Sequence, residues 1–129
     1  MFEQREQVNR LMLRARDAID RDYYRPLDIP SLARIACTSE AHFIRSFKRA
    51  FGETPHHYLK RRRIERAMHL LRSSTLPVTE VCAMVGFESL GPFSTAFRAL
   101  VGCSPTEFRR HATPLPVPGC FMRRWAGPA

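Results

Sequence analysis

Residues 27–59 read LDIPSLARIACTSEAHFIRSFKRAFGETPHHYL, and residues 76–109 read LPVTEVCAMVGFESLGPFSTAFRALVGCSPTEFR. The two stretches follow one pattern, in which the second copy holds one extra residue. Five landmarks of the first copy are Phe43, Phe47, Gly52, Pro55 and Tyr58. They align in order with Phe93, Phe97, Gly102, Pro105 and Phe108. A pattern that occurs only twice indicates a duplicated small unit, because a solenoid needs three or more repeats.

Each copy predicts two short helices that are joined by a tight turn. The apolar residues recur at helical spacing, which predicts helices at residues 31–36, 39–51, 79–85 and 90–101. In the first helix we expect Leu32, Ile35 and Ala36 to point inward. The turn falls at Cys37, where the second copy has Gly86. Ser39 is then placed to cap the second helix, since its hydroxyl can accept from an otherwise unpaired N–H group.

The segments around the two copies also favour helices. We expect them at residues 4–21, 55–72 and 105–111, with Pro55 at a first-turn position that needs no N–H. No stretch alternates as a strand does. The sequence therefore predicts an all-α, homeodomain-like fold of about seven helices. Its parts would be two helix-turn-helix subdomains at 1–54 and 74–111, a linker helix at 55–73 and a proline-rich tail at 112–129.

The charge of the chain is positive and unevenly distributed. Lysine and arginine number 21 against 12 acidic residues, which gives a net charge of +9, and the sequence pI is about 10.4. Residues 37–72 carry a net charge of +6, whereas residues 73–104 carry −1. Such a patch favours a polyanionic partner such as nucleic acid, although anionic membranes and acidic proteins also attract basic proteins.

The cysteines predict no metal, cofactor or catalytic site. Cys37, Cys82, Cys103 and Cys120 lack the close spacing of zinc ligands, and no histidine stands where a zinc-binding pair would need one. We expect reduced thiols in a cytoplasmic protein. The charged N-terminus is unlike a signal peptide, and no run approaches the ~20 apolar residues of a membrane span.

The second helix of the first copy has the composition of a helix that reads DNA. With Phe43 as the origin and 100° per residue, we expect Phe47, Ala50 and Phe51 to share its buried face. The opposite face holds Ala41, Arg45, Lys48 and Arg49, with His42 and Ile44 at its edges. A helix-turn-helix unit can place such a face in a DNA major groove.

The corresponding helix of the second copy carries less charge. Its outward face holds Gly91, Thr95, Arg98 and Ala99, with Pro92 and Ser94 beside it. Arg98 repeats the cation of Lys48. Ser94 and Thr95 could bond a base or a phosphate, and Leu90 could contact a thymine methyl group.

On these residues the chain resembles the DNA-binding domain of AraC/XylS-type bacterial transcription regulators. The runs HFIRSFKRAFGETP, VGFES, FSTAFR and GCSPTEFR carry the resemblance, which covers about residues 8–110. It implies double-stranded DNA and RNA polymerase as partners and two recognition helices that read successive major grooves. The base-reading positions that it implies are Ala41, Ile44, Arg45 and Lys48, then Leu90, Gly91, Ser94, Thr95 and Arg98.

We expect phosphate contacts around the first unit. The candidates are Ser39, His42, Arg49, Arg61, Arg62 and Arg63. The three consecutive arginines could instead pair with Glu65 or with acidic residues of the first helix. Members of the resembled family usually have a further effector or dimerisation domain, and no small-molecule site is evident here. The chain is either a stand-alone member or one domain of a longer protein, and Met1 favours the first reading.

Three other readings remain open. The chain could be a helix-turn-helix module that binds proteins without reading DNA, which the weak second helix would favour. It could be part of a DNA-repair alkyl-transfer enzyme, but no cysteine stands beside an activating base. Oxidation of Cys37 or Cys120 could also regulate DNA binding.

Overall fold

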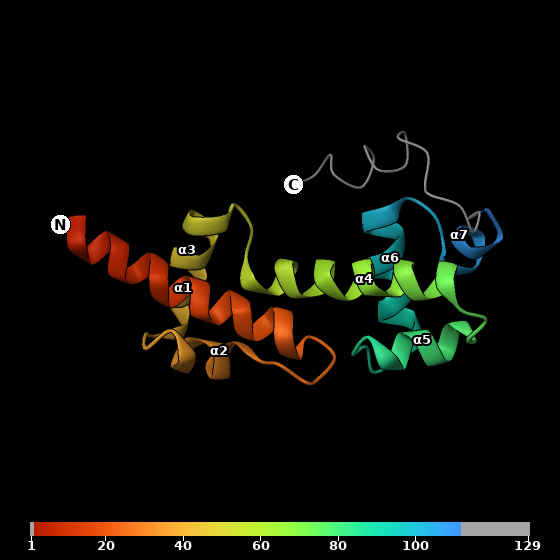
Figure 1. The fold of residues 1–129 in the computed structure, drawn as a ribbon, viewed down its shortest axis with the longest axis horizontal. Helices are drawn as coiled ribbons and strands as arrows, with labels where there is room; N and C mark the ends of the chain where they lie inside the picture. Colours follow the sequence, from red (N-terminus) through yellow and green to blue (C-terminus); the bar gives the residue numbers. More distant parts are fainter. Residues whose placement is uncertain (1, 112–129) are drawn as a thin grey trace. The chain divides into compact units, whose positions relative to one another are not determined.

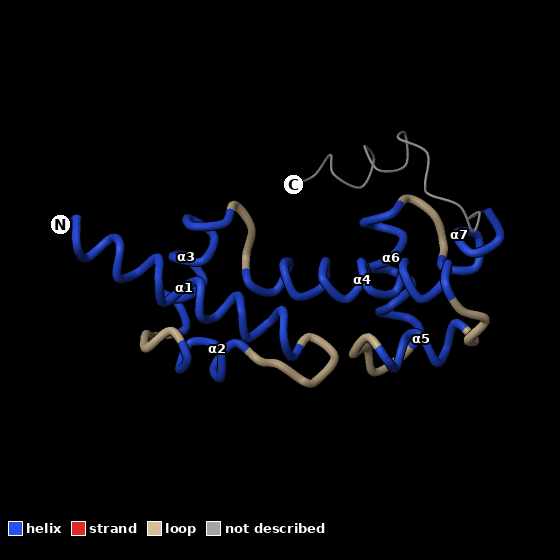
Figure 2. Tube along the Cα trace, viewed as in Figure 1, coloured by secondary structure: helices blue, strands red, loops and turns tan. Residues whose placement is uncertain are grey.

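The computed structural model describes residues 2–111, and every regular element among them is an α-helix. Short loops join these helices (Figures 1 and 2). Their bounds are α1 Phe2–Asp22, α2 Ile29–Ile35, α3 Glu40–Phe51, α4 Pro55–Ser73, α5 Val78–Met84, α6 Leu90–Val101 and α7 Pro105–His111. The all-α class and the seven helices predicted from the sequence are confirmed. The predicted tail at 112–129 lies outside the described residues.

The chain divides into two compact units between Arg62 and Arg63, inside α4. In the first unit α1 packs against both α2 and α3, which also contact each other. The first two turns of α4 add Tyr58 and Leu59 to this core. Its other buried members are Met12, Ala15, Ala18, Ile19, Leu32, Ala33, Ala36, Phe43 and Phe47.

The second unit repeats this construction with the remaining turns of α4 in the place of α1. Helix α6 packs against α5 and α7. Helix α4 contributes Ile64, Ala67, Met68, Leu70 and Leu71 to the core. Helices α5 to α7 contribute Val81, Cys82, Val85, Phe93, Ala96, Phe97, Val101 and Phe108. Burial of such side chains contributes about 1.5–3 kcal/mol for each large one.

The duplication extends to the backbone at the helix ends. Gly52 and Gly102 adopt φ angles of 80° and 99° and end α3 and α6 in the same way. The next helices begin alike, because Thr54 caps the N–H of His57 and Ser104 caps that of Glu107. The two copies therefore share the same backbone conformation at these helix ends, although several of the residues differ.

Three expectations about individual side chains or helix ends were wrong. Helix α2 begins at Ile29, because the Asp28 carboxylate accepts a hydrogen bond of 2.9 Å from the N–H of Ser31. Ile35 is 39% exposed, and Ala33 is buried in its place. Helices α1 and α3 both contact α2, and they cover the face that holds Leu32, Ala33 and Ala36. The centre of that face lies about 110° around the helix from Ile35.

The buried face of α3 also differs from the expected one. Ala50 is exposed near the end of the helix, whereas Ser46 is only 4% exposed. Ser46 tolerates burial because its hydroxyl lies 3.2 Å from Nε2 of His42. A buried hydroxyl that keeps a hydrogen-bond partner avoids the cost of desolvation.

Candidate nucleic-acid interface

The buried face of α3 fixes the direction of its outward face. Phe43 and Phe47 are fully buried, and their rings meet edge to face with centroids 5.7 Å apart. Ser39 holds the first turn by accepting the N–H of His42 at 3.2 Å. Five of the predicted DNA-contacting residues consequently lie on the exposed side, namely Ala41, Ile44, Arg45, Lys48 and Arg49. The structure brings them together on one surface of one helix.

The cations of this surface are electrostatically uncompensated. Arg45, Lys48 and Arg49 form no ion pair with any carboxylate of residues 2–111. Their charge is thus available to an external anion. Arginine in particular offers five N–H donors in a planar fork, which fits a phosphate or the O6/N7 edge of guanine.

The turn before α3 in the first unit and the turn before α6 in the second unit are equivalent, but different residues form them. Cys37 has a φ of 56°, and no other non-glycine residue in the described part of the chain has a positive φ. Gly86 occupies the equivalent turn with a φ of 103°. Cys37 is exposed, whereas Cys82 is buried and its thiol lies 3.4 Å from the carbonyl of Ser89. Burial raises the pKa of the Cys82 thiol.

Helix α6 presents a more neutral surface. Leu90, Gly91, Thr95 and Arg98 are exposed, and Ser94 is half-buried. The guanidinium of Arg98 lies 3.9 Å from a carboxylate oxygen of Glu107 in α7. The single cation of this face therefore has an intramolecular partner among the described residues, although both side chains remain largely solvent-exposed.

The start of α6 also differs from that of α3. Ser89 precedes α6 but makes no side-chain capping bond. In α3 the capped N–H belongs to His42, the third helical residue. The third residue of α6 is Pro92, which has no N–H to donate. The proline thus removes the group that the serine would otherwise satisfy.

Arg61 and Arg62 engage acidic side chains of their own unit. Arg61 donates to Glu53 at 2.8 Å, and Glu53 also lies 2.6 Å from Nδ1 of His57. Burial alone would raise the pKa of Glu53, but the hydrogen bonds from Arg61 and His57 outweigh it and lower the pKa. Arg62 donates to Asp20 at 3.0 Å. Both arginines thus pair with acidic side chains of the first unit, and their phosphate contacts remain predictions.

Arg63 also differs from a freely exposed cation. It is partly buried in the second unit, with its guanidinium 5.8 Å from the ring centre of Phe87. Burial lowers the pKa of this guanidinium. The three consecutive arginines of α4 consequently make contacts within the protein, whereas Arg45, Lys48 and Arg49 of α3 have no ion pair within residues 2–111.

The ion pair between Arg62 and Asp20 is one of the contacts that join α4 to α1 within the first unit. The hydroxyl of Tyr58 donates to the same oxygen of Asp20 at 2.7 Å. Burial and the neighbouring carboxylate raise the pKa of Tyr58 to about 12. The partners are 38 and 42 residues apart in the chain, so no local pattern identifies Asp20 as the acidic residue of the first helix that Tyr58 and Arg62 share.

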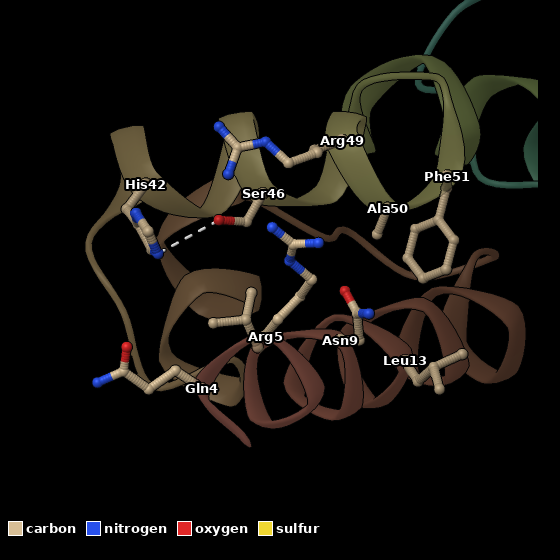
Figure 3. A pocket seen from close by; sticks show the side chains of 10 residues that line it. Gln4, Arg5, Asn9, Leu13, His42, Ser46, Arg49, Ala50 and Phe51 are labelled. Atoms are coloured by element: carbon tan, nitrogen blue, oxygen red, sulfur yellow. Dashed lines mark hydrogen bonds between the residues drawn. The ribbon is translucent and has the colours of Figure 1, made fainter. Parts of the chain in front are cut away.

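An open cleft of about 830 Å³ lies between α1 and α3 in the first unit (Figure 3). Arg5 extends from α1 toward α3, and Arg49 lies on the facing helix (Figure 3). No pattern in the sequence distinguishes Arg5, because seven basic and six acidic residues are interspersed over residues 1–36. Its role depends on which face of α1 meets α3.

The described residues contain neither a metal-binding cluster nor a helix that could cross a membrane. Within residues 2–111, no group of three or more His, Cys, Asp or Glu side chains is arranged to hold a metal ion. None of the described helices combines the length and hydropathy of a membrane span.

Residues 32–111 match a protein family described as a helix-turn-helix domain. The chain is 29% identical over 109 residues to the probable transcriptional regulator LumQ of Photobacterium leiognathi, a match that covers 84% of this chain and 44% of LumQ. The chain spans less than half the length of the curated relatives it matches.

Two solved structures are similar in fold. The C-terminal domain of AraT, a response regulator from Geobacillus stearothermophilus, has a TM-score of 0.76 and 33% identity, and the match covers 80% of this chain and 86% of that domain. The DNA-binding domain of the global transcriptional factor AdpA, solved in complex with a target DNA, has a TM-score of 0.73 and 28% identity. That match covers 77% of this chain and 89% of the AdpA chain.

Proposed function

The chain belongs to the AraC/XylS-type helix-turn-helix family, and from this premise we propose that it is a sequence-specific DNA-binding regulator of bacterial transcription. The observation that carries the proposal is the exposed face of α3. Arg45, Lys48 and Arg49 lie there without an ion pair to any of the described residues, and Phe43 and Phe47 bury the opposite face.

Helix α3 is the principal reading element in this proposal. Arg45 lies at the centre of the exposed face and donates to a guanine edge, while Ala41, Ile44 and Lys48 contact neighbouring bases. Ser39, His42 and Arg49 border this face and position the helix by phosphate contacts. Base contacts specify the sequence, whereas phosphate contacts set the register of the protein on the duplex.

Helix α6 enters a second major groove and makes fewer directed contacts. Leu90, Gly91, Ser94, Thr95 and Arg98 form its reading face. Thr95 and Ser94 supply short hydroxyl donors, and the exposed Leu90 supplies an apolar surface for a thymine methyl group. Arg98 exchanges its loose contact with Glu107 for a contact with DNA.

The partners and the setting follow from this role. The chain binds double-stranded DNA in the interior of a bacterial cell, and RNA polymerase is the protein partner of a regulator at a promoter. The role involves no catalysis and no cofactor. Arg61 and Arg62 stabilise the first unit, and any phosphate contact that they make is secondary to their ion pairs.

A protein-interaction module is the second candidate function. The observation that favours it is the nearly neutral face of α6, where Arg98 already lies near Glu107. In that case the helix-turn-helix units would bind another protein, and DNA affinity would be weak and nonspecific.

Selection of bound duplexes from a random pool tests the proposal. We expect one enriched sequence motif, and for random duplex a log K that falls linearly with the log of the salt concentration. Arg45→Ala should weaken the selected site by about 1–3 kcal/mol and relax one base position. A pool without an enriched motif would favour the protein-interaction module. If Arg45→Ala selected the same motif as the wild type, Arg45 would not be a base-reading residue.

A further inference from the structure

The cleft between α1 and α3 has a lining that suits a phosphate group. Arg5 and Asn9 reach into it from α1, and His42, Ser46 and Arg49 face them from α3. The two guanidinium groups stand on facing helices, as Figure 3 shows. Arg5 and Arg49 form no ion pair with any carboxylate in the described part of the chain. Two facing cations without a counter-charge are stabilised by an anion between them.

None of the described residues that line this cleft is acidic. Glu3 and Glu6 also lie at the start of α1, but they line a separate depression with Arg10. The anion that enters the cleft would consequently meet donors and no carboxylate. Guanidinium groups bind phosphate oxygens in a bidentate way, and the imidazole of His42 and the amide of Asn9 offer further donors.

The cleft also borders the face of α3 that would enter a DNA groove. Arg49 lines the cleft and stands only about 40° around the helix from Arg45. The major groove is about 12 Å wide, which is close to the diameter of an α-helix with its side chains. The flank of a helix that fills this groove therefore faces a sugar-phosphate strand, and α1 lies beyond that flank.

We propose that this cleft binds one backbone phosphate of the strand beside the half-site of α3, with Arg5 and Arg49 as its donors. Helix α1 thereby becomes part of the DNA interface as well as part of the core. This inference rests on the proposed function. The same donors could in principle take a free phosphate ion, so the experiment must distinguish the two sources.

The chain offers a matched control for Arg5 on the same helix. Arg14 is also an exposed arginine without an ion pair in the described residues. It follows Arg5 by nine residues, which places it about 180° around α1 from Arg5. Arg5→Ala and Arg14→Ala therefore remove the same charge from opposite faces of α1.

Salt titration of binding to a random duplex compares these variants. One lost phosphate contact reduces the slope of log K against log salt by about 0.9. We expect this reduction in Arg5→Ala, with an affinity roughly five- to tenfold weaker at 0.1 M salt, and no change of slope in Arg14→Ala. Equal slopes for the two variants would overturn the proposal.

Single methylphosphonate linkages in the selected site locate the contact. A neutral linkage at one position should weaken wild-type binding and leave Arg5→Ala binding unaffected. If every linkage affects both proteins equally, the cleft holds no DNA phosphate. Inorganic phosphate could instead stabilise the wild type but not Arg5→Ala, while Arg5→Ala and Arg14→Ala give equal slopes of log K against log salt. That result would show that the cleft binds a free anion, and it would overturn the contact with the DNA backbone.

These outcomes are separable from a failure of the proposed function. A wild-type protein that binds no duplex in a salt-dependent way would contradict DNA binding itself. A wild-type protein that binds, that is weakened by Arg45→Ala and that is equally affected by Arg5→Ala and Arg14→Ala would contradict only the role of the cleft.

Discussion

Cys37 shows at the scale of a single residue how the two copies have diverged. It holds a φ of 56° in the turn before α3, a conformation that glycine adopts without steric cost. For other residues the left-handed region costs about 1–2 kcal/mol. Gly86 meets the same requirement in the second unit at a φ of 103°. The first unit therefore carries local strain that the second avoids.

Replacement of Cys37 by glycine should relieve this strain. We predict that Cys37→Gly raises the free energy of unfolding by up to about 1 kcal/mol, because the added freedom of the unfolded chain offsets part of the gain. Gly86→Ala should lower it by about 1–2 kcal/mol. Urea unfolding measures both. Cys37→Ala is the control, since it removes the thiol but keeps the strained backbone, and a gain of similar size there would refute the explanation.

At the scale of the elements, the junction of α3 and α4 depends on the charge of Glu53. Its carboxylate joins Arg61 and His57, and its pKa is lowered although burial acts in the opposite direction. A carboxyl group with a lowered pKa in the folded state stabilises the fold above its ordinary pKa of 4.5. That contribution is lost as the pH falls through the lowered pKa.

Glu53→Gln should therefore destabilise the protein at neutral pH more than in acid. We predict a loss of about 1–2 kcal/mol at pH 7, and a difference from wild type that shrinks below pH 4.5. Urea unfolding between pH 7 and pH 3.5 measures this difference. Glu88→Gln is the control, because Glu88 is exposed and has no ion pair among the described residues. A difference that stays constant with pH would contradict the role of the Glu53 charge.

The two recognition helices should contribute unequally to binding. Helix α3 presents three cations that form no ion pair within residues 2–111, whereas the cation of α6 lies near Glu107. We predict that alanine at Arg45 or Lys48 weakens specific binding by about 1–3 kcal/mol, and that alanine at Thr95 or Arg98 weakens it by less than about 1 kcal/mol. A binding titration of each variant on the selected duplex measures these losses. Equal losses in both helices would show that α6 contributes as much to DNA binding as α3 does, despite its nearly neutral face.

Helix existence was predictable from the sequence because helix spacing, caps and prolines act locally. Ser39, Gly52 and Pro55 marked the ends of α3 and α4, and the structure agrees. The direction of Ile35 was not predictable, since α1 and α3 together decide which side of α2 is covered. The sequence offered pairing of the three consecutive arginines with acidic residues of the first helix as an alternative, but only the structure identifies Arg62 and Asp20 as such a pair.

The candidate site was predictable in part for the same reason. The outward position of Arg45 follows from helical spacing and from the burial of Phe43, and both belong to one element. The cleft at Arg5 could not be inferred, because it needs the packing of α1 on α3. The DNA-contacting roles of all these residues remain predictions.

At the scale of the whole molecule, one chain carries two recognition helices and should need no second copy to bind a bipartite site. Two helices that enter one face of B-DNA contact major grooves about 10–10.5 bp apart. We predict that five base pairs inserted between the half-sites reduce the affinity to that of the first unit alone, as measured in a binding titration. Five base pairs inserted outside the half-sites are the control, because they leave the spacing between the half-sites unchanged. Full affinity after the central insertion, or two chains on the minimal site, would contradict a single-chain bipartite complex.

Helix α4 belongs to two cores at once, and this has a consequence for how the protein melts. Its first turns bury Tyr58 and Leu59 in one unit, and its later turns bury Ile64 and Leu71 in the other. A helix of only two turns is marginal in water without packing along its length. Loss of either core would thus remove support from the helix on which the other depends. Heat should consequently unfold both units in one cooperative step, so that the two copies of the motif form a single thermodynamic unit.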